Sequence, residues 1–462
     1  MRFRLSALDR LDRAAIALIA VLLLASGWVA LRGDRSGVRV NALNPAEGAD
    51  NVSTHAPLRI VFEGAMVETS VESRLRVEPE TPGTLEWQGN ALLFRPDGGW
   101  STDTCYTVTL APSARSDEGR QVLRDLTWRF CTGGPRLLYL HDLDLGHWQL
   151  FILSPGDGEP VQLTDAPGGV FDYAVGPDGR TIAYAALRED GGADLWTADT
   201  EGGGQRKLLA CPEARCTSPT WSPDGRRIAY ERREAGEIGV GSGASRIWLL
   251  DPSTGETVPL FEEARMHGST PRWSPVDARL AYFDATQELA MRVYDLDAGT
   301  SVLIPTQSDL PGVWSPNGDR LLVTTIELLG SQVVYHLWLA DLEDGALVNL
   351  SGRDTPVQDA WPAWSPAGEW IAFTRRALTG EHATPGQQLW QMRPDGSQAH
   401  SLRIEPAATF GWVAWQPDGG ALAYVRRSLN DADARPELWL MELPDGEPER
   451  LAEVSTRPVW LP

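Results

Sequence analysis

One short sequence recurs along most of this chain and constrains its fold more than any other feature. Residues 221–230 read WSPDGRRIAY, and related strings lie around five other prolines. The prolines of the six copies are Pro177, Pro223, Pro275, Pro316, Pro366 and Pro417, at spacings of 46, 52, 41, 50 and 51 residues. A period in this range, with several short strands in each unit, is typical of a β-propeller.

Each copy has the chemistry of a tight turn between two strands. Proline fixes φ near −65°, aspartate bonds the neighbouring backbone, and glycine adopts a left-handed conformation. The turn joins an inner strand that ends in tryptophan to a second strand that carries Tyr or Phe, and a third strand follows. The third strands carry aromatic residues at matching positions: Phe151, Trp196, Trp248, Tyr294, Trp338, Trp390 and Trp439.

The two ends of the repeat region complement each other. Residues 136–164 supply a second, third and fourth strand, whereas residues 457–462, RPVWLP, supply a first strand alone. We therefore expect the C-terminal strand to complete the first blade and close a ring of seven blades, which leaves no exposed sheet edge.

The repeats resemble the WD40-like (PD40) repeats of the TolB family. The resemblance is carried by LTDAPGGVFDYAVGPDGRTIAY and by WSPDGRRIAYERR followed by RIWLLDPSTGE, and it covers residues 135–462. It implies a TolB-like β-propeller. TolB itself has a six-bladed propeller behind an α/β domain, so its role in outer-membrane transport is not implied for this chain.

Residues 38–132 form a second region, with about seven short alternating strands of the kind found in a β-sandwich. This region resembles the bacterial Ig-like domain of surface-layer and cell-envelope proteins. The resemblance is carried by NPAEGADNVSTHAPLRIVFEGAM, by the hairpin around Gln88, Gly89 and Asn90, and by CYTVTL and GRQVLRDLTWRFCT. It implies a spacer domain.

The N-terminus carries the single long apolar run, AAIALIAVLLLASGWVAL, at residues 14–31. It is long enough to cross a bilayer. Four arginines precede it, so residues 1–13 are predicted to be cytoplasmic, 14–32 a transmembrane anchor and 33–37 a linker. The protein is therefore predicted to be a single-pass cell-membrane protein with its C-terminal domains periplasmic or extracellular. Cleavage after Gly27 is the alternative.

The net charge of the chain bears on its binding partners, and its cysteines bear on disulfides and metal ligands. The formal net charge of −22 makes nucleic acid an unlikely partner. The four cysteines form two local pairs, Cys105 with Cys131 and Cys211 with Cys216. Outside the cytoplasm such pairs are more often disulfides than metal ligands, so we expect two disulfides.

Most candidates for chemistry have a simpler explanation. The turn aspartates Asp178, Asp224 and Asp418 could form a metal-binding ring, but Val276, Asn317 and Ala367 occupy the equivalent positions, which favours turn formation. Residues 141–147, HDLDLGH, match no zinc spacing. A G-x-S-x-G motif is absent, and the chain ends at ring closure. The sequence therefore predicts no cofactor, no metal and no enzyme activity.

Two sets of residues remain as candidate binding groups. Second strands end in arginines that converge on one face and could hold carboxylates or phosphates of a partner. These are Arg188, Arg232, Arg233, Arg375, Arg376, Arg426 and Arg427. The alternative is that they pair with nearby acids such as Glu189, Glu231 and Glu234. Asp172, Asp309 and Asp359, before first strands, could line the mouth of a central channel.

The leading prediction is a membrane-anchored binding or scaffold protein that recognises a protein, peptide or glycan partner in the cell envelope through its propeller. The fold supports this only by analogy. One alternative is a propeller enzyme, a lyase or hydrolase, with a site at the channel mouth that could use Ca²⁺. A purely structural envelope component is the other.

Overall fold

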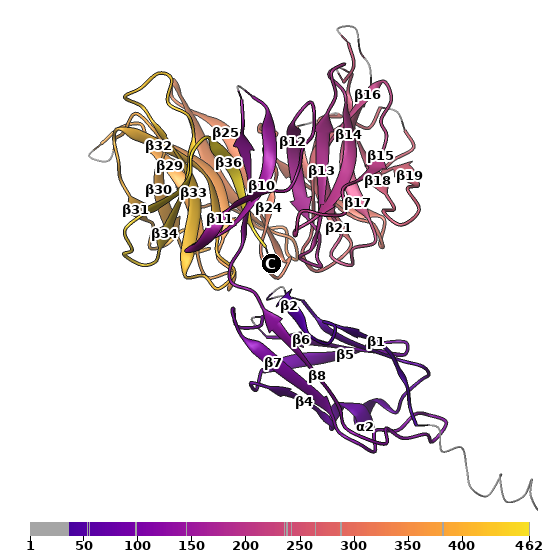
Figure 1. Ribbon diagram of the computed structural model, residues 1–462. Helices are drawn as coiled ribbons and strands as arrows, with labels where there is room; N and C mark the ends of the chain where they lie inside the picture. Colours follow the sequence, from indigo (N-terminus) through magenta and orange to yellow (C-terminus); the bar gives the residue numbers. More distant parts are fainter. Residues whose placement is uncertain are drawn as a thin grey trace, which may run out of the picture. The chain divides into compact units, whose positions relative to one another are not determined.

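The computed structural model describes residues 37–461, except for residues 53, 55, 98, 145, 235, 237, 238, 242, 264, 287, 288, 381 and 382. Within these residues nearly all regular structure is β-strand, and the single α-helix is α2 (Glu68–Glu72) (Figure 1). The predicted membrane segment 14–31 lies outside the described residues. In the part of the chain that is described, no helix is both long and apolar enough to cross a membrane.

The chain divides into two compact units. The first comprises the described residues up to Asp50 together with Pro57–Trp100 and Thr104–Thr132. The second comprises Asn51–Ala56, Ser101–Asp103 and the residues from Gly133 onward. Each unit is described below by itself.

The first region is a sandwich of two four-stranded sheets. One sheet has the order β1 (Val40–Asn44), β3 (Leu58–Phe62), β6 (Ala91–Pro96) and β5 (Gly83–Gln88). The other has the order β2 (Ala49–Val52), β8 (Leu126–Thr132), β7 (Cys105–Leu110) and β4 (Leu75–Glu78). Alternate residues of β7 and β8, among them Tyr106, Val108 and Phe130, are buried, so the strands follow the period of two expected of a sheet with one face on the core.

Both predicted disulfides are confirmed. Cys105 and Cys131 face each other in the antiparallel pair β7–β8, with their Cα atoms 3.9 Å apart. Cys211 and Cys216 close a short loop, with a sequence separation of 5 residues. All four cysteines are therefore engaged in disulfides.

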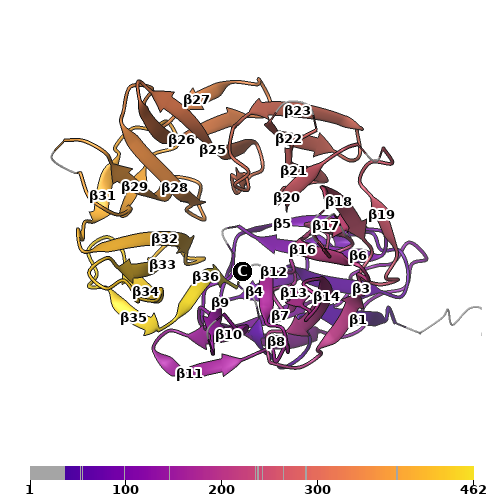
Figure 2. The same ribbon diagram turned by 90° about the horizontal axis from the view of Figure 1, so that it is seen from above.

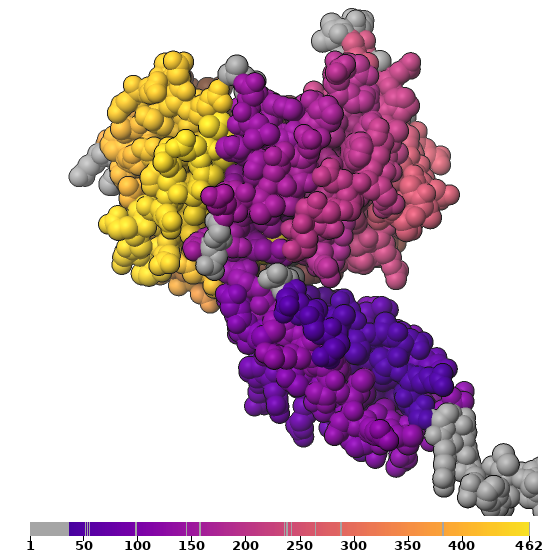
Figure 3. Space-filling model, viewed as in Figure 1, coloured from indigo at the N-terminus to yellow at the C-terminus, as the bar shows by residue number. Residues whose placement is uncertain are grey.

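The second unit is a ring of four-stranded arrays (Figure 2). The first array joins β9 (Leu137–Asp142), β10 (Trp148–Ser154) and β11 (Asp157–Gln162) to the last strand, β36 (Ser455–Trp460). Strand β36 pairs antiparallel with β9, so the two ends of the propeller segment meet in one array. Figure 3 shows the purple residues of this array directly beside the yellow C-terminal residues.

Six more arrays follow among the described residues, each with the same inner-to-outer order. Two are β12 (Val170–Val175), β13 (Thr181–Leu187), β14 (Ala193–Asp199), β15 (Arg206–Leu209), and β16 (Ala214–Trp221), β17 (Ile228–Glu234), β18 (Ser245–Leu250), β19 (Thr257–Pro259). Two are β20 (Gly268–Trp273), β21 (Arg279–Asp284), β22 (Ala290–Asp295), β23 (Thr300–Pro305), and β24 (Val313–Trp314), β25 (Arg320–Leu329), β26 (Gln332–Asp341), β27 (Leu347–Asn349). The last two are β28 (Val357–Trp364), β29 (Ile371–Ala377), β30 (Gln388–Met392), β31 (His400–Arg403), and β32 (Ala408–Trp415), β33 (Ala421–Ser428), β34 (Glu437–Glu442), β35 (Glu449–Ala452).

The core lies between neighbouring arrays. Ile182 and Tyr184 of β13, for example, pack in one apolar cluster with Leu138 of β9 and Ile152 of β10. The aromatic residues of the second strands lie in this core, and each is no more than 2% exposed: Tyr184, Tyr230, Tyr282, Phe373 and Tyr424. Burying side chains of this size is the main source of stability for a ring of sheets.

The repeated tryptophans and aspartates also have structural roles. The inner-strand tryptophans Trp314, Trp415 and Trp460 donate their indole N–H to a carbonyl of the preceding inner strand, at 3.0–3.2 Å. Asp178 Oδ1 accepts from the backbone N–H groups of Arg180 and Thr181, both at 2.9 Å. Asp224 and Asp418 accept from the backbone in the same way, so the predicted turn role is confirmed.

Candidate functional site

Five inner strands carry a bulge at the same place, and each bulge holds a residue other than glycine in the left-handed region. The register shifts lie within β16, β20, β28, β32 and β36. The residues are Ser218, Thr270, Trp361, Trp412 and Arg457, with φ between +48° and +54°. Such residues cost on the order of 1 kcal/mol or more each and cluster at functional sites. All five line one pocket.

This pocket, the channel pocket, has a volume of about 430 Å³. The inner strands β12, β16, β20, β28, β32 and β36 supply most of its wall, and Glu231 and Arg233 of β17 complete one side. A pocket of this size falls within the range used for small ligands. Because five inner strands contribute a residue at an equivalent position, the ring geometry brings together side chains far apart in sequence.

Asp172 is the buried acid of the channel pocket, with 8% of its surface exposed. Its Oδ2 accepts hydrogen bonds from the backbone N–H of Ser218 at 2.8 Å and from the Ser218 hydroxyl at 3.3 Å. Its Oδ1 is buried and has no hydrogen-bond partner among the described residues. Removal from water raises the pKa of Asp172, and Arg457, the Ser218 N–H and Arg272 oppose that rise.

Three arginines of the same pocket, Arg215, Arg272 and Arg457, are called the channel arginines below. Arg215 lies over the Phe171 ring at 4.5 Å. Arg457 lies between two rings, 5.4 Å from the centroid of Phe171 and 5.1 Å from that of Trp412. These contacts are cation–π interactions, which hold a guanidinium without neutralising it.

No carboxylate of the described residues lies within 4.0 Å of a channel arginine. Arg272 donates from Nη1 to the carbonyl of Pro271 at 2.8 Å. Burial lowers the pKa of Arg272, Asp172 raises it, and the like charge of Arg457 lowers it further. Trp412 contacts Trp361, with the ring centroids 4.0 Å apart and the ring planes tilted by 34°, so the row of rings and guanidinium groups continues across the pocket.

Of the residues predicted from the sequence as binding groups, Asp172 and Arg233 line the channel pocket. Arg233 is paired there with Glu231 at 2.6 Å. Asp359 is fully buried and holds Arg375 with both carboxylate oxygens at 2.7 Å. Asp309 is exposed, and its carbonyl accepts from the Thr270 hydroxyl at 3.3 Å. The predicted acids therefore do not share one site.

Most of the predicted arginines form ion pairs within their own arrays. Arg188 contacts Asp194 at 2.6 Å and Asp190 at 3.0 Å. Arg232 contacts Glu234 at 2.6 Å. Arg426 contacts Glu405 and Glu437. The Nε of Arg376 is buried without a hydrogen bond, and Arg427 is exposed. Pairing with nearby acids, the predicted alternative, is observed for Arg232 and Arg233, and binding of a partner by this arc stays a prediction.

The channel arginines and the tryptophan pair, Trp361 and Trp412, are not among the site residues predicted from the sequence. The signal that identifies the bulge residues is simple: each lies three positions before an inner-strand tryptophan, as Arg457 lies before Trp460 and Trp361 before Trp364. The repeat keeps the position and varies the side chain from Ser to Thr, Trp and Arg. Constant geometry with a variable side chain is typical of a binding surface on a fixed scaffold.

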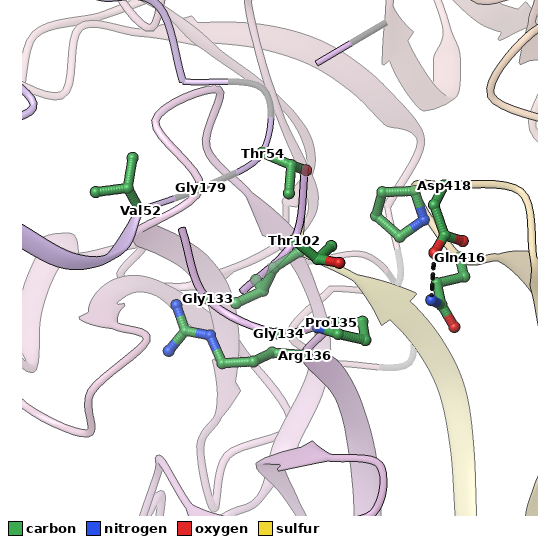
Figure 4. A pocket seen from close by; sticks show the side chains of 12 residues that line it. Val52, Thr54, Thr102, Gly133, Gly134, Pro135, Arg136, Gly179, Gln416 and Asp418 are labelled. Carbon is green, nitrogen blue, oxygen red and sulfur yellow. Dashed lines mark hydrogen bonds between the residues drawn. The ribbon is translucent and has the colours of Figure 1, made fainter. Parts of the chain in front are cut away.

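A second pocket is too small for a ligand. Figure 4 shows its lining residues, which all belong to the second unit and include Arg136, Gln416 and Asp418. Its volume of about 20 Å³ suits a single water molecule. Gln416 Nε2 donates to Asp418 Oδ2 at 2.9 Å in its wall. Within the described residues, no group of three or more His, Cys, Asp and Glu side chains gathers in a way that could hold a metal ion.

Comparison with known proteins matches residues 34–132 to the bacterial Ig-like domain family. The uncharacterized peptidase YuxL of Bacillus subtilis (strain 168) is 26% identical over 213 residues, which cover 38% of this chain and 32% of that protein. A prolyl endopeptidase structure, 15% identical, covers 70% of this chain and 49% of its own at a TM-score of 0.53. TolB from Acinetobacter baumannii, 13% identical, covers 84% and 83% at a TM-score of 0.44.

These matches correct one prediction. The prediction that the chain is not an enzyme is contradicted, because proteins that match part of this chain are named as peptidases. The matched region spans about a third of the length of YuxL and about half of the prolyl endopeptidase chain. The predicted resemblance to the bacterial Ig-like domain is confirmed for residues 34–132, and the sheets of the second unit agree with the predicted β-propeller.

Proposed function

We propose that this protein is a hydrolase-type enzyme acting on peptides, in which the propeller binds the substrate at the channel pocket. The observation that carries the proposal is the set of three channel arginines without a carboxylate partner, beside the half-satisfied carboxyl group of Asp172. Perturbed titratable groups that converge on a concave pocket favour a substrate site over a structural one. The peptidase relatives support peptides as the substrate class.

Each group of the pocket has a role in this proposal. The channel arginines bind negatively charged groups of the substrate with their N–H donors. Asp172, whose pKa is raised by burial, holds a proton at a higher pH than an exposed aspartate does. The adjoining rings of Trp361 and Trp412 offer an apolar surface for substrate side chains. The proposal includes no metal ion.

The test measures peptide cleavage by the full-length protein, with N-acetylated tripeptides as substrates and mass spectrometry as the readout. We expect cleavage by the wild type and by Arg180→Gln, a matched change at an exposed arginine outside the pocket. Asp172→Asn and Arg272→Gln should lower the rate at least tenfold. Absence of cleavage for every peptide overturns the hydrolase proposal, and unchanged rates in both pocket variants remove the channel pocket from it.

The cellular placement belongs to the same proposal. Residues 1–13 are cytoplasmic, 14–32 form the anchor and 33–37 the linker, and the Ig-like domain, 38–132, carries a seven-bladed propeller, 135–462, outside the membrane. The charge asymmetry around the apolar run and the two disulfides support this arrangement. Protease added to intact spheroplasts should remove the propeller, and its protection until lysis argues against the arrangement.

A second candidate function is binding of a protein partner in the envelope. One observation favours it: β25 and β26 form the longest hairpin of the ring, with exposed apolar side chains near its tip. Ile326, Leu328 and Val333 are 38%, 75% and 44% exposed. Exposed apolar side chains that adjoin one another mark interaction surfaces. Replacing Leu328 with Ser should reduce crosslinking to a partner in cells if this surface is used.

A further inference from the structure

We propose that the channel pocket is a carboxylate receptor, which takes a peptide by a free carboxylate group, at its C-terminus or on an acidic side chain. This inference rests on the proposed function and names the part of the substrate that the pocket recognises. Three observations support it: the aromatic rings that contact the channel arginines, the net positive charge of the pocket, and the pocket volume.

Aromatic rings hold the guanidinium groups of Arg215 and Arg457. Arg457 is fixed between the rings of Phe171 and Trp412, and Arg215 lies on Phe171. An aromatic ring contacts the flat face of a guanidinium and leaves the N–H groups at its edge available. The described residues provide no carboxylate within 4.0 Å of these arginines, so the edge donors are positioned and unneutralised.

The side chains that line the channel pocket carry a net positive charge. Four arginines and two acids line the pocket. Arg233 and Glu231 neutralise each other at 2.6 Å, and Glu231 also accepts from the backbone N–H of Thr270 at 3.3 Å. Three arginines and Asp172 remain, which gives the pocket a net charge of at least +2. In a protein with a formal charge of −22, this local excess fits an anionic group of the ligand.

Asp172 supplies a further polar group to the wall that holds the channel arginines. Asp172 Oδ1 has no hydrogen-bond partner among the described residues, although it is buried in the same wall. A protonated carboxyl group can donate one hydrogen bond to a carboxylate oxygen, while the planar guanidinium fork binds carboxylates in a bidentate way. The neighbouring surfaces of Trp361, Leu310 and Pro311 are apolar and suit the carbon skeleton of a peptide.

The volume of the channel pocket limits the size of the ligand. The pocket volume of about 430 Å³ accommodates a few residues of an extended peptide and excludes a folded protein. The bulge residues Ser218, Thr270 and Trp361 keep their left-handed conformations, so the wall is fixed by the backbone. A wall that is set before binding costs little ordering entropy when a ligand enters.

The experiment compares two ligands that differ only in the group recognised. Isothermal titration of the full-length protein uses acetyl-Leu-Ala-Ala with a free C-terminal carboxylate and the same peptide as its C-terminal amide. We expect the free acid to bind at least tenfold more tightly. Acetyl-Glu-Ala-amide tests an acidic side chain as the source of the carboxylate, and binding to it near that of the free acid assigns recognition to the carboxylate rather than to the peptide end.

Variants locate the effect. Arg272→Gln and Arg457→Gln should reduce the difference between acid and amide to less than threefold, whereas Arg180→Gln, at an exposed arginine outside the pocket, should preserve it. Tryptophan fluorescence follows the same titrations through Trp361 and Trp412, and needs no variant. Equal binding of acid and amide to the wild type overturns the carboxylate receptor and leaves the proposed function standing. Tighter binding of inorganic phosphate than of the acid also overturns it. Failure of every peptide to bind overturns both.

Discussion

Arginines occur in two settings in this propeller, and the settings differ in what holds the guanidinium. The blade-edge arginines each contact a carboxylate of their own strand, a neighbouring strand or an adjoining loop; they are Arg188, Arg232, Arg375 and Arg426. The channel arginines lie in the pocket wall without such a carboxylate, and two of them rest on aromatic rings. Carboxylates of the protein neutralise the blade-edge arginines, whereas the channel arginines are left to pair with an anionic ligand.

The difference has an energetic consequence. A buried ion pair offsets the cost of removing two charges from water, and deletion of one partner leaves the other charge unpaired. A guanidinium held by a π face gains less, about 0.5–2 kcal/mol, and leaves no charged partner behind when it is removed. The blade-edge arginines should therefore matter for stability, and the channel arginines for binding.

The strongest test of this comparison is Arg375→Ala. Asp359 is fully buried and accepts from Arg375 through both oxygens, with the Ser351 hydroxyl as its other donor at 2.6 Å. Loss of the guanidinium leaves this carboxylate without its counter-charge, so we expect a loss of about 3–5 kcal/mol in the free energy of unfolding. Urea denaturation measures it. The double variant Arg375→Ala, Asp359→Asn should recover part of the loss, and a single-variant loss below about 1 kcal/mol would contradict the blade-edge role.

The Cys211–Cys216 disulfide connects the two settings and gives the next largest effect. The loop contains Arg215, a channel arginine, and Arg188 donates to the carbonyl of Cys211 at 2.9 Å. Its short loop makes the chain-entropy contribution about 2 kcal/mol. Cys211→Ala, Cys216→Ala should lower stability by that amount and weaken carboxylate binding. Removal of the Cys105–Cys131 disulfide in the first unit is the control, and it should leave binding unchanged.

The sequence predicted the elements that repeat and missed those that depend on register. Turn chemistry and the aromatic residues of the second strands recur in the chain, so the propeller and its core could be inferred. The pairing of Arg375 with Asp359 depends on which residues face each other across β28 and β29, which no repeat motif states. Phe171, Trp412 and Arg457 come from three different arrays and meet only when the ring closes.

The bulges illustrate the same limit. A residue other than glycine with positive φ cannot be recognised from its own identity, because Ser218, Trp412 and Arg457 share no side-chain chemistry. Only their constant spacing from the inner-strand tryptophan identifies them. The absence of a G-x-S-x-G motif led to the prediction that the chain is not an enzyme, and the matches to proteins named as peptidases contradict that prediction.

The pH dependence of stability should show a smaller effect, which tests whether the pKa of Asp172 in the channel pocket is raised. Because burial raises the pKa of Asp172, its protonated form stabilises the fold below its ordinary pKa, and this contribution is lost as the pH rises through the raised pKa. Asp172→Asn keeps an acceptor for the Ser218 N–H and cannot ionise. We expect its melting temperature to exceed that of the wild type at pH 7 by a few degrees, with the gap closing towards pH 4. Parallel melting curves across this range would count against a raised pKa.

The smallest effect on stability should come from a matched pair of arginines, and it separates stability from binding. Arg180 is exposed, and Arg457 contacts two rings, so Arg180→Gln and Arg457→Gln should each change the unfolding free energy by less than about 1 kcal/mol. Their binding should differ: Arg457→Gln should weaken the free-acid peptide at least tenfold, and Arg180→Gln should leave it unchanged. Urea denaturation and calorimetry on the same samples measure both quantities. If the two variants weakened binding equally, the position of an arginine relative to the channel would not determine its role, and the distinction between the two settings would fail.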